Sequence, residues 1–253
     1  MDSKLNKTKM LIKGLINLLM IVGLASCATF DKSKNRLKTE LSRVNTVDDE
    51  TIAINGLINE YTAERFRKTI TSKTRKVILN SPGGYTLPAI EIGNLIYDRG
   101  LDVEVVDLCG SACANFIFPA GRRKIINNDA IVAWHGSNSY LLYQDKQKNI
   151  IRTEGWLTSL NKEIDEENRF FKKIGVNGFI CWFGMVYPYN TWYSYTLNKN
   201  DMEKFGIRGV EVRENYPYTD SALNNLKINI KYGYIKVNWT SLEASMLDIE
   251  KSR

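Results

Sequence analysis

The fold is decided by residues 76–118, which read KVILNSPGGYTLPAIEIGNLIYDRGLDVEVVDLCGSACANFIF. Two β-branched apolar runs, 76–80 and 101–106, predict buried strands. Between them, residues 86–99 carry apolar side chains at near-helical spacing and end before Gly100. A strand, a helix and a second strand joined by short loops form the unit from which parallel sheets are built. The stretch therefore predicts an α/β fold with a largely parallel sheet.

Further elements are expected on both sides of this stretch. They are strands at 51–56 and 131–134, helices at 62–72, 111–118, 154–174 and 198–206, and an aromatic-rich packing segment at 179–195. The helix at 62–72 is expected to be capped by Thr62. Together these elements place one α/β domain at residues 51–210.

Residues 211–253 are expected to form a C-terminal extension around a β-hairpin at 228–239. Apolar side chains alternate with polar ones on both sides of Gly233 and Tyr234. A two-residue loop with glycine first suits the type II′ turn that joins antiparallel strands. The alternation therefore predicts a turn at Gly233-Tyr234 and one apolar face on the hairpin.

Composition limits the classes of protein to which the chain can belong. Its 253 residues are 43% hydrophobic and 25% charged, which excludes a disordered chain, a collagen-like repeat and a many-span membrane protein. Because His135 is the single histidine, a metal site with several imidazole ligands is excluded, and no metal or other cofactor is expected. The net charge of +7 falls to about +4 without residues 1–26, and no basic run is interleaved with aromatics, so nucleic-acid binding is not expected.

Residues 1–26 carry the pattern of a secretory signal. Four lysines precede an apolar run at 15–25, which is shorter than the about 20 apolar residues that span a bilayer. The run ends in Leu24-Ala25-Ser26-Cys27, which resembles the lipobox of bacterial lipoproteins and implies a lipid on Cys27. A plain signal peptide or N-terminal anchor with an incidental cysteine is the alternative interpretation.

The residues after Cys27 suggest where the chain is anchored. The next residue is Ala28 rather than aspartate, which favours the periplasmic face of the outer membrane in a cell with two membranes. Residues 27–50 are polar and charged, and we expect them to form a tether leading from the membrane to the folded domain.

Three segments carry groups suited to acyl transfer, namely 80–84 (NSPGG), 109–113 (CGSAC) and 134–136 (WHG). A glycine pair after a strand lets a backbone amide point at a bound oxyanion. A serine at the start of a helix lies beside amides that have no intrahelical partner. Histidine takes up a hydroxyl proton near neutral pH. Each segment alone also has an ordinary interpretation, as a turn, a helix cap or a hydrogen-bonded core histidine.

The order and spacing of these segments resemble the Clp protease proteolytic subunit and its exported relatives in the Clp/crotonase superfamily. The resemblance covers about residues 52–210. Its further carriers are Asn55-Gly56-Leu57-Ile58, Ala120-Gly121, the 24-residue spacing from Ser111 to His135, and Asp201-Met202-Glu203-Lys204-Phe205-Gly206-Ile207. It implies a ββα superhelical domain that binds extended peptide or unfolded segments by strand addition. It also allows a homo-oligomer, since relatives commonly form trimers, hexamers or heptameric rings.

Carried over position by position, the resemblance implies the roles of four residues. Ser111 would be the nucleophile and His135 the general base. The amides of Gly84 and Ala112 would form the oxyanion hole.

Two departures from the family pattern affect this assignment. The family's catalytic aspartate lies about a dozen residues before the glycine that Gly206 matches, and here residues 193–196 (YSYT) contain no carboxylate. A Ser–His dyad, recruitment of Asn190 or a hydroxyl to orient the histidine, and an inactive site remain open. Cys109 and Cys113 also flank Ser111, either as a disulfide or as small packing residues.

The leading hypothesis is a lipid-anchored, ATP-independent serine peptidase that hydrolyses peptides or unfolded segments. The alternative is a catalytically impaired Clp-fold pseudoenzyme that binds peptides or a protein partner. Crotonase-type acyl-thioester chemistry is a weaker third hypothesis, because the chain is expected to be exported and carries no recognisable coenzyme A loop.

Overall fold

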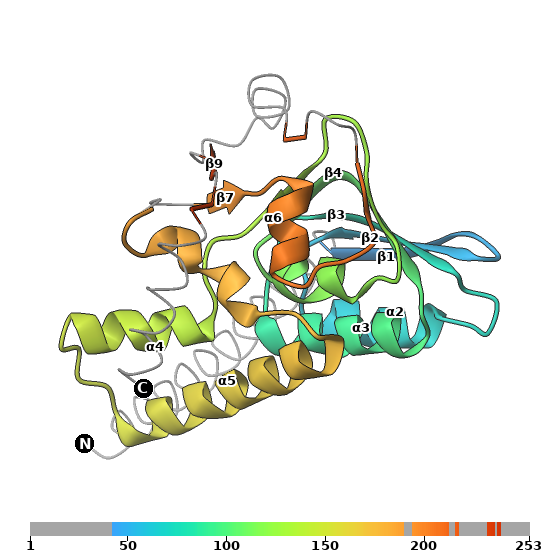
Figure 1. Cartoon of the computed structure of the whole chain (residues 1–253). Coiled ribbons are helices and arrows are strands. Elements are labelled where there is room, and N and C mark those ends of the chain that lie inside the picture. Colours follow the sequence, from blue (N-terminus) through green and yellow to red (C-terminus); the bar gives the residue numbers. More distant parts are fainter. Residues whose placement is uncertain (1–41, 190–193, 213–215, 218–231, 236, 239–253) are drawn as a thin grey trace, which may run out of the picture. The chain divides into compact units, whose positions relative to one another are not determined.

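The computed structural model describes residues 42–189, 194–212, 216–217, 232–235 and 237–238 (Figure 1). The expected signal peptide, Cys27 and most of the tether lie outside these residues, as do Asn190 and most of the C-terminal extension. Among the described residues, no helix is both long and apolar enough to cross a membrane.

The centre of the domain is a seven-stranded sheet. Its strands are β1 (Ser42–Asp48), β2 (Thr51–Gly56), β3 (Lys76–Ser81), β4 (Asp102–Gly110), β5 (Lys124–Ile126), β6 (Ile131–Ala133) and β8 (Val210–Glu211). The order is β1-β2-β3-β4-β5-β8, with β6 also paired to β4. The β1–β2 pair is antiparallel and every other pair in this sheet is parallel, so the predicted α/β class with a largely parallel sheet is confirmed.

Helices follow the strands along the chain. They are α2 (Glu60–Thr69), α3 (Thr86–Asp98), α4 (Asn138–Gln147), α5 (Glu154–Ile174) and α6 (Lys199–Lys204), with a π-helical turn η1 (Cys113–Ile117) and 3-10 turns η2 (Phe118–Ala120), η3 (Gly178–Cys181) and η4 (Phe183–Met185). Figure 1 shows α2 and α3 side by side along one face of the sheet. Helix α5 packs along α3.

The core lies between the sheet and these helices. The apolar side chains of β2, β3 and β4 that face the helices are fully buried, as expected for parallel strands covered by helices. The π-helical turn η1 is buried too, and Phe116 contacts Phe170 and Phe171 of α5 at ring-centroid distances of 5.7 and 5.5 Å. Gly93 of α3 allows this close packing, because a Cβ there would lie 2.2 Å from the Phe116 carbonyl oxygen.

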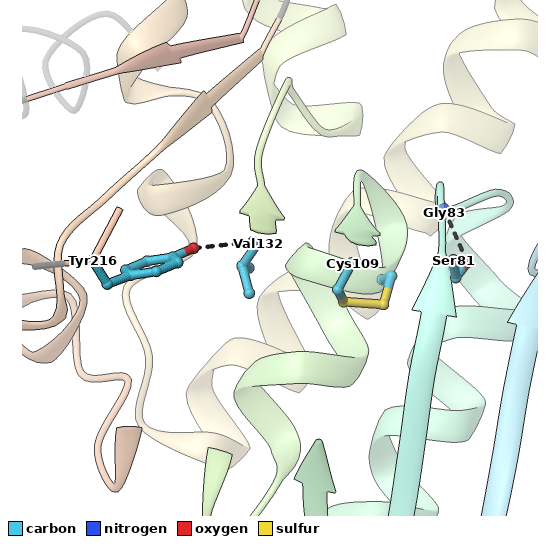
Figure 2. Close-up of a disulfide and its surroundings, with 6 residues drawn as sticks. Ser81, Gly83, Cys109, Val132 and Tyr216 are labelled. Atoms are coloured by element: carbon cyan, nitrogen blue, oxygen red, sulfur yellow. Dashed lines mark hydrogen bonds between the residues drawn. A yellow bond between two sulfur atoms is a disulfide. The ribbon is translucent and has the colours of Figure 1, made fainter. Parts of the chain in front are cut away.

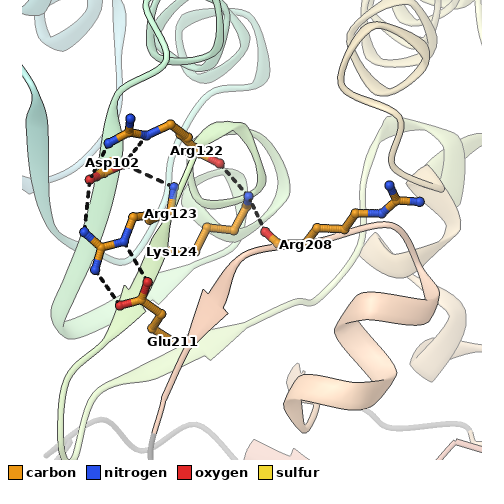
Figure 3. A network of polar contacts seen from close by, with 7 residues as sticks. Asp102, Arg122, Arg123, Lys124, Arg208 and Glu211 are labelled. Atoms are coloured by element: carbon orange, nitrogen blue, oxygen red, sulfur yellow. Dashed lines mark hydrogen bonds and ion pairs between the residues drawn. The ribbon is translucent and has the colours of Figure 1, made fainter.

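A network of ion pairs ties together the strand ends opposite the three motif segments. Figure 3 shows Arg122 and Arg123 beside Asp102 at the start of β4, with Arg123 also paired to Glu211 of β8. Lys124 is buried beneath them, and its ammonium donates to the carbonyl of Arg208 at 2.8 Å. Burial lowers the pKa of Lys124 to about 8. These contacts hold β4, β5 and β8 together.

Two predictions near the N-terminal end of the domain need correction. Residues 42–48, expected in the tether, form strand β1, whose backbone pairs with β2 while most of its side chains face solvent. An edge strand tolerates such a polar sequence, which is why its composition indicated a tether. Helix α2 is capped by Asn59, whose side chain accepts from the Thr62 amide, so Thr62 lies inside the helix rather than at its cap.

The predicted turn at Gly233-Tyr234 is wrong. Both residues belong to strand β9 (Tyr232–Tyr234), which pairs in parallel with β7 (Ser194–Thr196). Of the two predicted strands, the described residues contain one short strand at 232–234, and its backbone partner is β7 rather than a second strand of a local hairpin. Residues 228–231, 236 and 239 of the predicted hairpin lie outside the described residues.

Candidate active site

The three motif segments meet at one edge of the sheet. Strands β3, β4 and β6 are parallel neighbours, with Ser81 paired to Cys109 and Gly110 paired to Ala133. Their carboxyl ends therefore face the same way, and the turn at 81–84, the nucleophile candidate Ser111 and the base candidate His135 follow directly from them. The sheet register brings together the segments that the sequence singled out.

Ser111 is held in an unusual backbone conformation. Its φ is 53°, in the left-handed region that a residue other than glycine adopts at a cost of about 1–2 kcal/mol. Its amide donates to the carbonyl of Ala133 at 2.9 Å, and its carbonyl accepts from the amide of Asn115 at 2.8 Å. No hydrogen bond joins its hydroxyl to another of the described residues. A strained serine at a strand-to-helix turn presents its hydroxyl outward, as a nucleophile requires.

The glycine turn after β3 lies directly on Ser111. A Cβ on Gly83 would stand 2.6 Å from the Cβ of Ser111 and 2.9 Å from the amide nitrogen of Ala112. The turn is fixed on its other side, because Gly83 accepts from the Ile58 amide and Ile58 accepts from the Tyr85 amide, both at 2.8 Å. Only glycine permits this approach, at a φ of 101°.

Gly84 and Ala112 present amides suited to an oxyanion. Neither N–H donates to any of the described residues. Ala112 begins the helical segment after Ser111, where amides have no intrahelical partner. Because Gly83 touches the Ala112 amide, the neighbouring Gly84 amide lies close to it as well. Two free amides beside a serine can stabilise the oxygen of a tetrahedral intermediate.

Cys109 and Cys113 form a disulfide that brackets Ser111 (Figure 2). Their Cα atoms are 5.3 Å apart, and both residues are fully buried. Figure 2 shows the bridge next to the turn that carries Ser81 and Gly83. Of the two interpretations that the sequence left open, the structure has the disulfide, and it ties the end of β4 to the first turn of the following helix.

His135 follows β6 at the edge of the sheet, with one part of its surface open to solvent and the rest surrounded by protein atoms. Desolvation by the protein atoms around its ring lowers the pKa of His135 below its ordinary 6.5, and a contact with its own backbone carbonyl partly offsets that effect. The imidazole is therefore neutral near pH 7, the state in which it accepts a proton. Among the described residues, it makes no hydrogen bond to the Ser111 hydroxyl.

The backbone on both sides of His135 is fixed by hydrogen bonds. Before it, Trp134 and Tyr195 exchange two backbone bonds of 2.9 Å, and the Ser194 hydroxyl donates to the Trp134 carbonyl at 2.9 Å. After it, the Gly136 amide donates to the carbonyl of Cys181 at 2.7 Å. The imidazole is thus positioned by its main chain.

Ser194 lies beside the chain segment that carries His135, since its hydroxyl donates to the carbonyl of Trp134. Trp134 and Tyr195 are partners in an isolated antiparallel bridge, so His135 directly follows one partner and Ser194 directly precedes the other. Among the described residues, a buried hydroxyl rather than a carboxylate therefore bonds to the backbone next to the base candidate.

Two contacts around His135 were not predicted from the sequence. Asn115 donates from its side-chain amide to the carbonyl of Gly136 at 2.8 Å. Glu167 of α5 caps α4, accepting from the amides of Asn138 and Ser139 at 3.0 and 3.4 Å. Burial raises the pKa of Glu167 to about 7, and these hydrogen bonds partly offset the effect. The sequence could have indicated that Glu167 is buried, because it lies seven residues after the buried Leu160 and therefore on the same face of α5.

Comparison with known proteins gives likenesses only among solved structures. No family model matches the chain. No curated protein matches it. A mutant of ClpP1 from Listeria monocytogenes matches with 17% identity and a TM-score of 0.45, over 66% of this chain and 94% of that one. ClpP1 from the same organism matches with 17% identity and a TM-score of 0.39, over 64% of this chain and 91% of that one. At such distances the likeness carries no argument about activity, and we infer function from the site geometry.

Proposed function

We propose that the chain is a serine peptidase that cleaves peptides or unfolded segments by acyl transfer to Ser111. The observation that carries this proposal is the approach of the glycine turn to the serine. It sets the Gly84 and Ala112 amides, neither of which donates to any residue that the structure describes, beside a serine held at a φ of 53°. A serine that served only as a helix cap would need neither the strain nor the free amides.

The reaction follows from these groups. His135 takes the hydroxyl proton of Ser111 as the oxygen attacks a peptide carbonyl. The resulting oxyanion accepts hydrogen bonds from the amides of Gly84 and Ala112. When the intermediate collapses, His135 passes its proton to the departing amine and an ester remains on Ser111. Water then attacks the ester, giving its proton to His135, and the carboxylic acid leaves as the serine is restored.

We propose that the site works as a Ser–His dyad. Among the described residues no carboxylate hydrogen-bonds to His135, and the side chain bonded to the backbone before it is the hydroxyl of Ser194. The Ser194 hydroxyl donates to the Trp134 carbonyl, which leaves its oxygen able to accept a further hydrogen bond. In the well-studied triad of another protein, loss of the orienting acid lowers kcat about 10⁴-fold, so we expect slow turnover.

The cellular setting of the proposal rests on sequence alone. A lipid on Cys27 would anchor the chain at the periplasmic face of the outer membrane, with the tether after it. Without an ATP-driven unfoldase in that compartment, substrates would be peptides or segments that are already unfolded. The site would take them in extended form, and several copies of the chain could associate.

A catalytically impaired binding protein is the second candidate. It is favoured by the absence of a hydrogen bond between Ser111 and His135 among the described residues, together with the missing acid. Catalytic hydrogen bonds are often long in unliganded sites, however, and tighten when substrate binds. The serine's strained conformation also has no use in a protein that only binds.

Labelling with a fluorophosphonate probe tests the proposal. The full-length protein in detergent should acquire one phosphonyl group on Ser111, located by mass spectrometry of its peptides. Ser111→Ala should abolish labelling and His135→Ala should slow it at least 100-fold, while both unfold at the temperature of the parent chain. If the folded parent chain stays unlabelled, or is labelled elsewhere, the proposal is wrong and the binding protein takes its place.

A further inference from the structure

We propose that Asn115 is a positioning residue that sets the spacing of Ser111 and His135, an inference that rests on the proposed function. Asn115 lies one turn after Ser111 in the π-helical turn η1. Its backbone amide donates to the Ser111 carbonyl at 2.8 Å, and its side-chain amide donates to the Gly136 carbonyl at 2.8 Å. One buried residue thus contacts the segment of the nucleophile and the segment of the base.

The hydrogen bond from Asn115 to the Gly136 carbonyl restrains a point of the backbone that could otherwise change its conformation. Gly136 has a φ of 120°, a conformation that only glycine adopts readily, and glycine leaves the backbone free to change. The backbone bond from Ser111 to Ala133 fixes the chain before His135. The Asn115 bond fixes it on the other side. Together they hold the base segment against the nucleophile segment from both directions.

Other contacts of the base segment do not reach the nucleophile. The carbonyl of Cys181 accepts from the Gly136 amide, and the hydroxyl of Ser194 donates to the Trp134 carbonyl. Both residues come from the chain after residue 175, so neither bond joins the base segment to the segment of Ser111. Asn115 is the side chain, among the described residues, that bonds across the gap between the two segments. Misplacement of a reacting group by about 1 Å can cost about 100-fold in rate.

The polar accounting of Asn115 points the same way. Its side chain is buried, and its carbonyl oxygen Oδ1 has no hydrogen-bond partner among the described residues. The other such orphan there is the indole N–H of Trp134, directly before His135. Buried polar atoms are nearly always paired, so orphans call for an explanation. A leucine would fill the Asn115 site without leaving an acceptor unpaired. The hydrogen bond from the Asn115 side-chain N–H to the Gly136 carbonyl explains why an amide is present there.

The π-helical form of η1 is consistent with this role. A π turn inserts an extra residue into the helical path and is frequently found at functional sites. Here it follows Ser111, and Cys113 to Ile117 are all buried. The turn aims Asn115 at Gly136 while its neighbour Phe116 packs against α5. The geometry of Asn115 therefore belongs to the site rather than to the core alone.

The test replaces Asn115 by leucine and by alanine in the full-length protein. Asn127→Leu is the matched control, because its amide donates a bond of similar length, 2.9 Å, to Glu104 at a distance from the site. We expect both Asn115 variants to fold and to be labelled by the fluorophosphonate about 10- to 100-fold more slowly. Asn127→Leu should be labelled within about twofold of the parent rate.

A second readout does not depend on activity. His135 is the single histidine, so its imidazole signals in an NMR titration are unambiguous. Loosening of Gly136 should move the pKa of His135 up toward its ordinary 6.5 in both Asn115 variants, as the ring becomes better solvated.

A variant that folds, titrates as the parent does and is labelled at the parent rate overturns the role of Asn115. If the parent chain itself is not labelled, the proposed function fails, and the titration alone decides the role of Asn115. If the leucine variant does not fold, the alanine variant supplies both readouts, and unfolding of both variants would make the residue structural and overturn the proposal.

Discussion

Reduction of the disulfide between Cys109 and Cys113 should slow acylation of Ser111 by more than its effect on folding accounts for. The bridge closes a loop over a sequence separation of 4, and the chain-entropy relation for so short a loop gives about 2 kcal/mol of stabilisation at 25 °C. Breaking it should therefore lower the free energy of unfolding by about 2 kcal/mol. A domain with an ordinary stability of about 5–15 kcal/mol remains folded after that loss.

The effect on the nucleophile comes from the strain that the bridge restrains. Ser111 lies inside the closed loop with a φ of 53°, which costs about 1–2 kcal/mol relative to an ordinary conformation. Without the bridge, relaxation of that strain would favour other conformations by a factor of about 5–30. The amide bond to Ala133 and the contact with Gly83 remain and oppose the relaxation. We therefore expect labelling of Ser111 to slow about tenfold.

The assay compares labelling rates before and after treatment with dithiothreitol, with the redox state read by intact mass after alkylation. The double variant Cys109→Ala/Cys113→Ala is the control, since it should be slow with or without the reductant. Reoxidation of the parent chain should restore its rate. Cys181 is buried and lies outside the bridge, so its thiol is the same in both states. If the parent is labelled at its oxidised rate while mass shows the bridge broken, Ser111 is held by other contacts and the reasoning fails.

Two further predictions concern pH. Because desolvation lowers the pKa of His135, the labelling rate should rise with pH through a single step centred below the ordinary 6.5, and a midpoint above 6.5 would contradict its assignment as a desolvated base. Glu167 should make folding less favourable as pH rises: its folded pKa of about 7 exceeds the ordinary 4.5, so its protonated form stabilises the fold below pH 4.5 and that stability is lost as pH passes 7. Between pH 5 and pH 8 this loss amounts to about 2.5 kcal/mol, and urea unfolding at the two pH values should show it in the parent but not in Glu167→Gln.

The central strands and the long helix could be predicted because local pattern and burial agree there. Strand β2 has the predicted bounds, and so does α5, whose apolar stripe packs on α3. The meeting of the motif segments at one edge also follows from the predicted parallel sheet, because the carboxyl ends of adjacent parallel strands lie at the same edge. Where helices cover the sheet, the strands are buried and their sequences are correspondingly apolar, so the burial of each strand can be predicted from its residues.

What could not be predicted depends on partners far along the chain. Strand β1 is polar because it lies at an edge, and its place is set by backbone pairing with β2. Strand β9 is set by pairing with β7, about 38 residues earlier, which a local hairpin pattern does not indicate. Asn115 and Ser194 contact the base segment across 21 and 60 residues. No local pattern marks such contacts.

The missing acid and the unusual constraints at this site are best understood together. In a triad, a carboxylate holds the imidazole in place through its side chain. Here the main chain holds it, through Tyr195 before the ring and Asn115 after it, while the disulfide and the glycine turn hold Ser111. These constraints have local costs. Ser111 has a strained φ, the Oδ1 atom of Asn115 has no partner among the described residues, and the turn requires a glycine at position 83. A domain that only bound a partner would gain nothing from them, whereas a dyad whose base has no carboxylate partner in the described part of the chain needs both groups placed in advance by the backbone.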